Sequence, residues 1–169
     1  MSELPRSERL DAELPDPVAH LEFADRQLND PIVAPWHGGP RPTERIESML
    51  VAQRAQAAEA GFTLWWWRDR ASGELVGYAG LNRDEVEQEP IVEIGWSIAP
   101  SRWGEGLAPE AAKVVLDWGF ERCGLERIVS FALADNERSQ RVMEKIGMSF
   151  DREFERRGLP HLLYDIRHG

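Results

Sequence analysis

A short segment with two closely spaced glycines is the part of this sequence best suited to chemistry. Residues 93–112 read EIGWSIAPSRWGEGLAPEAA, in which a predicted strand runs into a turn holding Gly104 and Gly106, and a helix follows at once. Glycines let backbone N–H groups approach a ligand closely, and a helix directs its positive N-terminal end to the same place. The pattern predicts an anion site suited to a pyrophosphate. Taken alone, it also fits a tight strand-to-helix turn that merely needs two glycines.

Length and composition indicate one globular domain. The chain has 169 residues, of which 42% are hydrophobic and 30% charged, enough to build a core. No run approaches the roughly 18 to 20 apolar residues that span a bilayer, and the N-terminus lacks a signal-peptide pattern, so we expect a cytoplasmic protein. The net charge of -10 disfavours a general nucleic-acid binder, and it favours, weakly, a basic partner or a cationic substrate.

The cysteine and histidine content argues against a metal site. Cys123 is the only cysteine, so neither an intrachain disulfide nor a cysteine-based metal site can form. The histidines show no metal-ligand spacing; they are His20, His37, His161 and His168. Cys123 is also rejected as an acyl-enzyme nucleophile, because no histidine or other catalytic context lies near it in the sequence. We therefore expect no metal.

The pattern of apolar residues predicts the order of helices and strands. Residues 1–20 are interpreted as a loosely ordered lead-in and residues 30–42 as an irregular loop. Helices are predicted at 18–29, from a cap at Thr43 to Gly61, at 109–122, and from a cap at Asn136 to residue 146. Strands are predicted at 62–67, 75–81, 91–99, 127–134 and 161–166. This order predicts an α/β domain with a mixed sheet covered by helices.

A second segment follows the glycine turn at a characteristic distance. Residues 136–148 read NERSQRVMEKIGM. Together the two segments resemble the acetyl-CoA-binding motifs of the GNAT acetyltransferases, whose turn reads Gln/Arg-x-x-Gly-x-Gly/Ala and whose later helix reads N-x-x-S…E-K-x-G-F. Trp103 departs from the first motif and Met148 from the second, but W-G-x-G-x-A is a usual spelling in the Rim-type branch, which acetylates N-termini of ribosomal proteins.

The resemblance, good over residues 61–154, implies a fold and an activity. The fold is a single α/β (α+β mixed) domain with a central mixed, mostly antiparallel twisted sheet and helices on both faces. Residues 91–150 form the acetyl-CoA-binding core, and the divergent residues 1–60 shape the acceptor side. The implied activity is an N-acyltransferase that moves an acetyl group from acetyl-CoA to a primary amine of a small molecule or a protein N-terminus. Neither nucleic acid nor membrane is an expected partner, and a homodimer is compatible because dimers are common among relatives.

The resemblance also assigns residues to the cofactor. The backbone of Ser97, Ile98 and Ala99 would pair with the pantetheine arm, and that of 103–108 would hold the pyrophosphate. Asn136 and Ser139 would contact the pantetheine or acyl region, while Arg102 and Arg141 would meet the phosphates. The six turn residues are Trp103, Gly104, Glu105, Gly106, Leu107 and Ala108. Simpler interpretations stay open: an ordinary buried strand, a plain helix cap and solvated arginines.

Two residues are candidates for the proton chemistry. An ammonium acceptor must lose a proton before attack, and Glu93 lies on the strand where several relatives place their base. Glu153 and Glu155 are weaker candidates, and Glu93 also fits a solvated strand glutamate. Many relatives use a tyrosine as the acid where this chain has Met143, so assistance to the leaving sulfur falls to Ser139 or a water. Ser139 also fits a plain helix-start serine.

Aromatic residues add two further expectations. Trp65, Trp66 and Trp67 alternate across a strand, so at least one ring should be exposed or face a groove. Core packing and hairpin pairing explain most of the run, and a role in the substrate groove or in a dimer contact is the alternative. By analogy of position, Trp36 and His37 would shape the acceptor pocket. Three alternatives to acetyl transfer remain: a succinyl or longer acyl donor, a non-catalytic acyl-CoA-binding module, which the absence of a tyrosine at Met143 keeps open, and a structural domain without a ligand.

Overall fold

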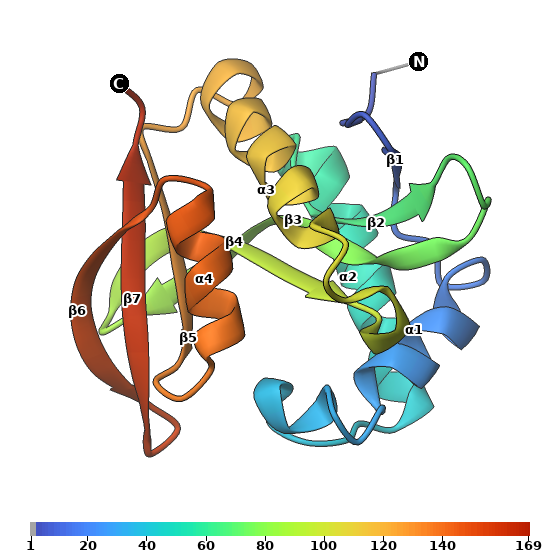
Figure 1. Ribbon diagram of the computed structural model, residues 1–169, viewed down its shortest axis with the longest axis horizontal. Helices are drawn as coiled ribbons and strands as arrows, with labels where there is room; N and C mark the ends of the chain where they lie inside the picture. The colour runs from blue at the N-terminus through green and yellow to red at the C-terminus, as the bar shows by residue number, and fades with distance from the viewer. Residues whose placement is uncertain (1–2) are drawn as a thin grey trace.

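The computed structural model describes residues 3–169 and shows in them a seven-stranded sheet with helices on both faces (Figure 1). The strands are β1 Leu10–Glu13, β2 Leu64–Asp69, β3 Leu75–Val86, β4 Glu89–Ile98, β5 Arg127–Leu133, β6 Ser149–Arg156 and β7 Leu159–Arg167. The helices are α1 Leu21–Leu28, α2 Thr43–Ala60, α3 Leu107–Asp117 and α4 Glu137–Lys145, with short 3-10 segments at Ala34–His37 and Pro100–Arg102 and a π turn at Trp118–Arg122. The predicted mixed sheet between helices is confirmed.

The sheet is held together unevenly at its centre. Its order is β1-β2-β3-β4-β5-β7-β6, and neighbouring strands are antiparallel except β4 and β5. The β3–β4 pair extends over ten opposed residue pairs. Within the described residues, the parallel β4–β5 pair is in register at one position, Glu93 opposite Val129. β4 is thus firmly attached to one half of the sheet and barely to the other, which creates an opening in the middle of the sheet.

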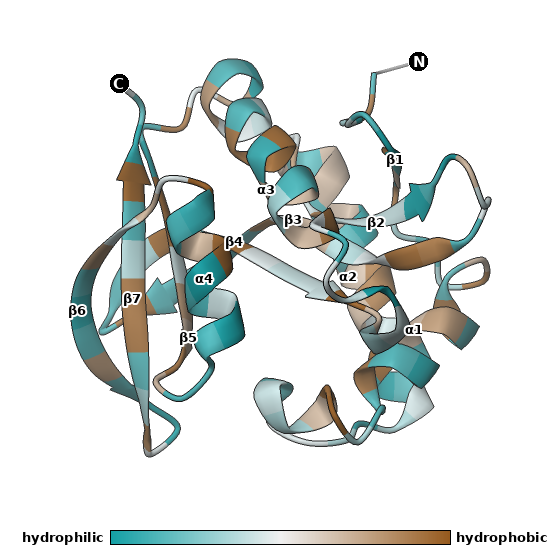
Figure 2. Cartoon of the chain, in the orientation of Figure 1, coloured by the Kyte–Doolittle hydropathy of each residue, from teal (hydrophilic) through white to brown (hydrophobic). Residues whose placement is uncertain are grey.

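Two buried clusters attach the helices. Ala111 of α3 and Met143 of α4 belong to the larger cluster on one face, and Leu28 of α1 and Leu50 of α2 belong to the cluster on the other face. Figure 2 shows α4 as a mostly hydrophilic helix, and Val142 and Met143 are its buried residues. Among residues 3–169, no helix has both the length and the apolar composition to cross a bilayer.

The three consecutive tryptophans are all buried, so the expectation that one ring is exposed or faces a groove is wrong. Trp65 and Trp67 pack in the cluster beneath α3, whereas Trp66 packs against α1 and α2. The Trp66 ring also donates from Nε1 to Gln53 Oε1 (3.2 Å). The expectation failed because helices cover both faces of β2. Side chains that alternate between the two faces of this strand therefore enter one buried cluster or the other, and none reaches the surface.

Residues 3–20 are tied to the sheet and to α3, which corrects the interpretation of this segment as a loose lead-in; residues 1–2 of that prediction lie outside the described residues. Residues Leu10–Glu13 pair antiparallel with β2 at the sheet edge. Just before them, Ser7 Oγ and the backbone N–H of Arg9 donate to Glu110 Oε1 on α3 (2.6 and 2.9 Å), and Arg9 Nε donates to Glu110 Oε2 (2.7 Å). A strand this short depends on its partner rather than on local pattern, so the sequence carried little signal for it.

Further differences from prediction include the starts of α2 and α3 and the presence of β6. Thr43 is the first residue of α2 rather than its cap; Pro42 precedes the helix, and the Thr43 hydroxyl donates to Asp25 on α1 (2.8 Å). α3 begins at Leu107, before the predicted start at 109, because Gly106 caps it in a left-handed conformation. Strand β6 was not predicted, because its residues are mostly exposed at the sheet edge and lack a clear apolar alternation.

Candidate active site

A cavity of about 580 Å³ opens where β4 and β5 separate. β4 contributes residues 93–98 to its walls, β5 contributes 130–133, and α4 with its cap contributes 135–139 and 141–143. The Ser130 hydroxyl of β5 donates to the carbonyl oxygen of Ile94 (3.0 Å) where the two strands begin to diverge. Trp103 and Ala108, at the two ends of the glycine turn, also line it, whereas residues 104–107 do not. The predicted strand, the ends of the turn and the second motif therefore meet around one space.

Two of the three predicted backbone positions on β4 are engaged elsewhere. The Ala99 N–H donates to Val76 O on β3 (2.8 Å), and Ala99 does not line the cavity. Ser97 lines the cavity, but its carbonyl accepts a hydrogen bond from Gln27 Nε2 of α1 (2.7 Å), and the same nitrogen donates to Ser97 Oγ (3.0 Å). The backbone of these two residues is directed toward β3 and α1.

Ile98 is the predicted backbone position that faces the opening. In an antiparallel pair, successive residues direct their N–H and C=O groups to opposite sides, so Ile98 and Trp96 direct theirs away from β3, to the side that β5 has left. The Ile98 carbonyl accepts a hydrogen bond from Trp103 Nε1 (2.7 Å). This bond joins the strand end to the start of the glycine turn and leaves the N–H of Ile98 directed to the opening.

The glycine turn has the conformation of an anion cradle. Gly104 and Gly106 adopt φ values of 83° and 77°, in the left-handed region that side chains disfavour. A Cβ on Gly104 would have no atom within 4 Å, and one on Gly106 would have only the Arg9 side chain at 3.8 Å, so the approach is open. Leu107 anchors the helix start in the core, and no side chain caps the first N–H groups of α3. These donors are available to an anion.

Arg102 lies behind this turn in an ion-pair network. Its guanidinium donates to Asp69 Oδ2 (2.6 Å) and to Glu105 Oε2 (2.7 Å), and the Arg102 hydrogen bond holds the Asp69 pKa below its usual value. The Glu105 carbonyl accepts from Arg9 Nη2 (2.9 Å). Arg102 does not line the cavity. These contacts orient the turn; the predicted contact with phosphates stays a prediction.

The start of α4 places a hydroxyl in the same cavity. The Asn136 side chain accepts a hydrogen bond from the Ser139 N–H (3.2 Å), which is the geometry of the predicted helix cap. The half-buried Ser139 side chain lines the cavity, and Met143, one turn later, is 1% exposed and lines its inner wall. Where relatives use a tyrosine, this chain therefore presents an apolar thioether, and Ser139 supplies the nearby O–H.

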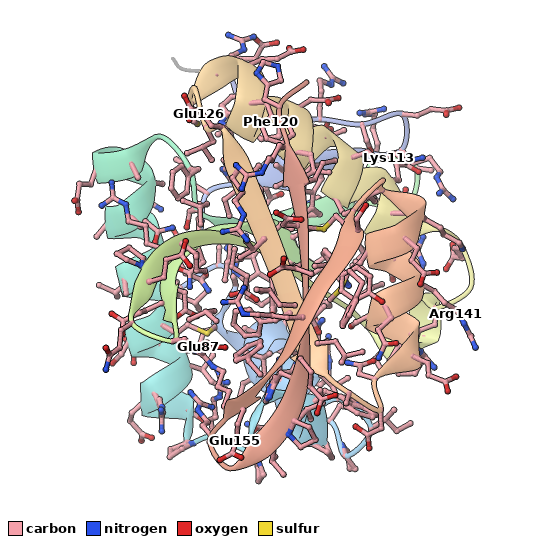
Figure 3. The ribbon with its side chains drawn as sticks, turned by 90° about the vertical axis from the view of Figure 1, so that its left-hand side faces the viewer. Glu87, Lys113, Phe120, Glu126, Arg141 and Glu155 are labelled. Atoms are coloured by element: carbon pink, nitrogen blue, oxygen red, sulfur yellow. The ribbon has the colours of Figure 1, made fainter. Side chains whose placement is uncertain are left out.

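Two arginines of α4 behave differently from one another. Arg141 lines the cavity rim, but it is exposed and paired with Glu137 (3.3 Å), and Figure 3 shows it projecting outward from the helix. The Arg138 guanidinium lies over the Trp103 ring, 3.4 Å from the centroid, and so joins α4 to the glycine turn across the cavity. This contact is with a residue distant in sequence, which pattern alone does not show.

Glu93 lies at the junction of this cavity with a second one of about 450 Å³. Burial raises the pKa of Glu93 to about 8; the charge of Asp84 adds to the shift and that of Arg156 opposes it. Gly95 lies on the same face of β4, and a Cβ there would be 3.9 Å from Glu93 Oε1, so the missing side chain leaves room beside the carboxyl. Tyr78 of β3 lines both cavities, and burial raises the pKa of its phenol.

The other predicted acceptor-side residues divide into two groups. Trp36 and His37 line both cavities, as the analogy of position suggested. Burial, followed by the nearby Arg41 charge, lowers the pKa of His37 to about 4, so its ring is neutral at neutral pH. Glu153 and Glu155 lie exposed on β6 and line neither cavity; Figure 3 shows Glu155 near the β6–β7 turn.

Known proteins share this geometry. The model of the acetyltransferase (GNAT) domain matches residues 15–149, which is most of the chain. The chain belongs to the GNAT acetyltransferase family. The match includes both predicted motifs, and it extends into the N-terminal region that the motif resemblance covered poorly. It confirms the predicted family, fold and acyl-CoA-dependent N-acetyltransferase activity.

Individual relatives agree with this assignment. The uncharacterized protein YkkB of Bacillus subtilis (strain 168) is 29% identical over 138 residues, which cover 82% of this chain and 80% of that protein. The crystal structure of an acetyltransferase from Agrobacterium tumefaciens strain C58 is 26% identical, covers 99% of this GNAT chain and 96% of its own, and superposes with a TM-score of 0.85.

A structure of RimL, a ribosomal L7/L12 alpha-N-protein acetyltransferase in complex with coenzyme A, shares the fold. It superposes with a TM-score of 0.79 at 16% identity and covers 97% of both chains. At this identity the likeness shows the fold alone, and the Rim-type branch stays a prediction.

The GNAT domain also contains site residues that were not predicted from the sequence. Trp96 shares the backbone orientation of Ile98, and the alternation of the strand was the signal that could have found it. Tyr78 carried no such signal, because its position beside Glu93 depends on the register of β3 against β4, where Tyr78 is opposite Ser97. Gln27, which holds the Ser97 carbonyl, is likewise brought to the site only by the packing of α1.

Proposed function

We propose that this protein transfers the acetyl group of acetyl-CoA to a primary amine by direct attack, with Glu93 accepting the amine proton and Ser139 donating a hydrogen bond to the leaving sulfur. The observation that carries the proposal is the position of Glu93: it lines both the cavity between the diverging strands and the cavity next to it. A carboxyl at such a junction can serve an amine in one cavity and a thioester in the other.

The residues present fit coenzyme A. The uncapped start of α3 and the open left-handed glycines Gly104 and Gly106 suit a pyrophosphate, and the outward-directed N–H of Ile98 suits an amide of the pantetheine arm. The structural neighbour RimL was crystallised in complex with coenzyme A. Contacts of the phosphates with Arg102 and Arg141 belong to the same proposal, as do a homodimer and a cytoplasmic location.

The proposed reaction balances with the groups present at the site. The amine nitrogen attacks the thioester carbon, the C–N bond forms and the C–S bond breaks. The amine proton passes to the Glu93 carboxylate, directly or through water, and the sulfur leaves as a thiolate that accepts the Ser139 hydroxyl hydrogen bond. Met143, buried beside Ser139, offers no proton, so this hydroxyl stabilises the thiolate rather than protonating it fully. Holding both reactants in adjoining cavities supplies much of the rate.

The proposal is tested by isothermal titration of the purified protein with acetyl-CoA, CoA and succinyl-CoA. Gly106→Glu puts a carboxylate and a side chain into the cradle, so we expect it to abolish micromolar binding. Gly124→Glu is the matched control: Gly124 has φ 64°, a Cβ added there would meet no atom within 4 Å, and it lies beyond the opposite end of α3. We expect this control to bind acetyl-CoA as the wild type does.

The titration separates the remaining alternatives. Tighter binding of succinyl-CoA than of acetyl-CoA would identify succinyl, rather than acetyl, as the group transferred. Binding without turnover on any amine would leave a non-catalytic acyl-CoA-binding module. Absence of binding to CoA and to both of its thioesters, in protein with a normal melting curve, would refute the proposed function.

A further inference from the structure

The second cavity is placed to hold the amine. It measures about 450 Å³ and is walled by α2, β3, the loop at residues 35–41 and the β6–β7 turn. It shares Trp36, His37, Tyr78 and Glu93 with the first cavity. We term this second cavity the acceptor cavity. Because the wall it shares with the first cavity includes Glu93, an amine bound in the acceptor cavity lies next to both the proposed proton acceptor and the thioester.

Basic side chains outnumber acidic ones in the lining of the acceptor cavity. Its lining includes three arginines, Arg41, Arg156 and Arg157, and two carboxylates, Asp84 and Glu93. Arg156 Nη2 contacts both oxygens of Asp84 (3.1 and 3.3 Å), so these two charges compensate each other. Arg156 Nη1 also donates to the Glu85 carbonyl, which fixes the pair against the wall.

The other two arginines have no such partner. Arg41 Nη2 donates to the His37 carbonyl (2.9 Å) and Nη1 rests against Met49 Sδ (3.8 Å). Arg157 Nη1 lies 3.2 Å from the position that a Cβ on Gly38 would take, so it approaches the same loop from the β6–β7 turn. Within residues 3–169, neither guanidinium lies within 4.0 Å of a carboxylate.

The remaining ionisable groups do not cancel this excess. His37 is neutral at neutral pH because burial lowers its pKa to about 4. Burial raises the pKa of Glu93 to about 8, so it is largely protonated there. Three guanidiniums therefore face one ionised carboxylate, and the acceptor cavity is positive although the whole chain carries a net charge of -10. The weak expectation of a cationic substrate, drawn from net charge, does not hold for this cavity.

We propose that the acceptor is a primary amine that also carries a carboxylate, which Arg41 and Arg157 bind while the amine reaches Glu93. This assignment rests on the proposed acetyl transfer. Guanidinium groups bind carboxylates and phosphates through paired N–H···O bonds, and they repel a polycationic acceptor. Two sources supply such chemistry: free amino acids, and peptides with an acidic residue next to the N-terminus.

The test measures acetyl-transfer kinetics with acceptors matched in pairs. The reaction is monitored through the CoA thiol that it releases. One set compares free amino acids with their C-terminal amides; the other compares amidated tripeptides Ala-Glu-Ala and Ala-Gln-Ala. We expect kcat/KM to be about tenfold higher for the anionic member, the usual effect of one hydrogen-bonded charge pair. A preference within the first set identifies free amino acids as the acceptors, and a preference within the second set identifies peptides with an acidic residue next to the N-terminus. The amine of an amino-acid amide is less basic and more often unprotonated, which biases the first set against the proposal.

Variants assign the preference to the two arginines. In Arg41→Gln and in Arg157→Gln, we expect the ratio of kcat/KM for the anionic acceptor to that for the neutral acceptor to fall toward one. Arg41→Lys should retain part of the preference for the anionic acceptor. Arg83→Gln is the matched control, because Arg83 is an exposed β3 arginine paired with Glu59 that lines neither cavity. Arg157 lies on an exposed turn, so its variant is informative even where Arg41→Gln lowers the melting temperature.

Three results would overturn the acceptor assignment. The first is an equal rate for the anionic and neutral members in the wild type, and the second is a ratio unchanged in both glutamine variants. The third is acetylation of neither set by protein that still binds acetyl-CoA in the titration. Loss of acetyl-CoA binding itself would refute the proposed function instead, so the two failures are distinguishable.

Discussion

Replacing Glu93 with glutamine tests the proton acceptor most directly. The change keeps the size of the side chain and removes the ionisable group between the two cavities. In the wild type, a pKa of about 8 means that the carboxylate, the active form of a base, increases as pH rises through 8. At pH 7 about one-tenth of the molecules hold the carboxylate form, and at pH 9 about nine-tenths do.

The expected magnitude follows from these fractions. The wild-type rate should rise about tenfold from pH 7 to pH 9 through Glu93 alone, in addition to the change caused by the amine acceptor. Because the acceptor titrates equally in both assays, the ratio of wild-type to Glu93→Gln kcat/KM isolates Glu93. That ratio should increase about tenfold across the same interval, while acetyl-CoA affinity stays unchanged.

The assay is CoA release at saturating acetyl-CoA from pH 6 to pH 9.5, with Glu153→Gln and Glu155→Gln as controls. Both control residues lie exposed on β6 and line neither cavity, so their ratios to wild type should be flat. A ratio that stays near one across this range would refute the role of Glu93 as base. A ratio that is flat but well above one would show a base already ionised at pH 6, as a solvated carboxyl would be, and would refute the raised pKa.

A stability measurement checks the same pKa without catalysis. A carboxyl whose folded pKa lies above its unfolded value binds more protons in the folded state between the two values, here 4.5 and about 8. Its contribution to the free energy of unfolding is therefore largest below pH 4.5 and is lost as pH rises toward 8. Glu93→Gln should be more stable than the wild type at pH 8 by a larger margin than at pH 5, as measured by urea denaturation.

Two further substitutions probe the cavity and the sheet. Ser139→Ala should lower kcat by about tenfold to a hundredfold, the effect of losing one hydrogen bond to a charged atom, with acetyl-CoA affinity nearly unchanged in the titration; an unchanged kcat would assign the thiolate to another donor. Gly80→Ala should destabilise the fold by about 1–3 kcal/mol or more in urea, because the new Cβ would lie 2.0 Å from the Thr63 carbonyl oxygen. Gly95→Ala, whose Cβ would meet its nearest atoms at 3.8 and 3.9 Å, serves as the control strand glycine, and equal losses at both positions would contradict the clash.

Local chemistry was readable along the chain. The φ values of Gly104 and Gly106 and the Asn136 cap are decided by a few adjacent residues, so their spacing predicted both the anion cradle and the start of α4. The helix and strand order followed from apolar periodicity for the same reason. Glu93 could be nominated as base from its strand position, but only the fold shows that burial raises its pKa.

Features that depend on distant partners were not predictable. β1 and β6 are edge strands that exist through pairing with β2 and β7, and the burial of Trp66 depends on α1 and α2 covering the second face of β2. The placement of Arg138 over Trp103 joins two segments across the cavity.

The sequence by itself determined the family, the conformation of the glycine turn and the kind of reaction, because these reside in contiguous motifs whose backbone conformations are local. Tertiary structure alone decided the sign of the charge around the proposed acceptor cavity. Net charge counts every residue equally, whereas a bound amine senses only the groups around it, and folding brings Arg41 and Arg157 to one cavity while Asp84 is neutralised by Arg156. A chain with a net charge of -10 can therefore present a positive cavity to its substrate.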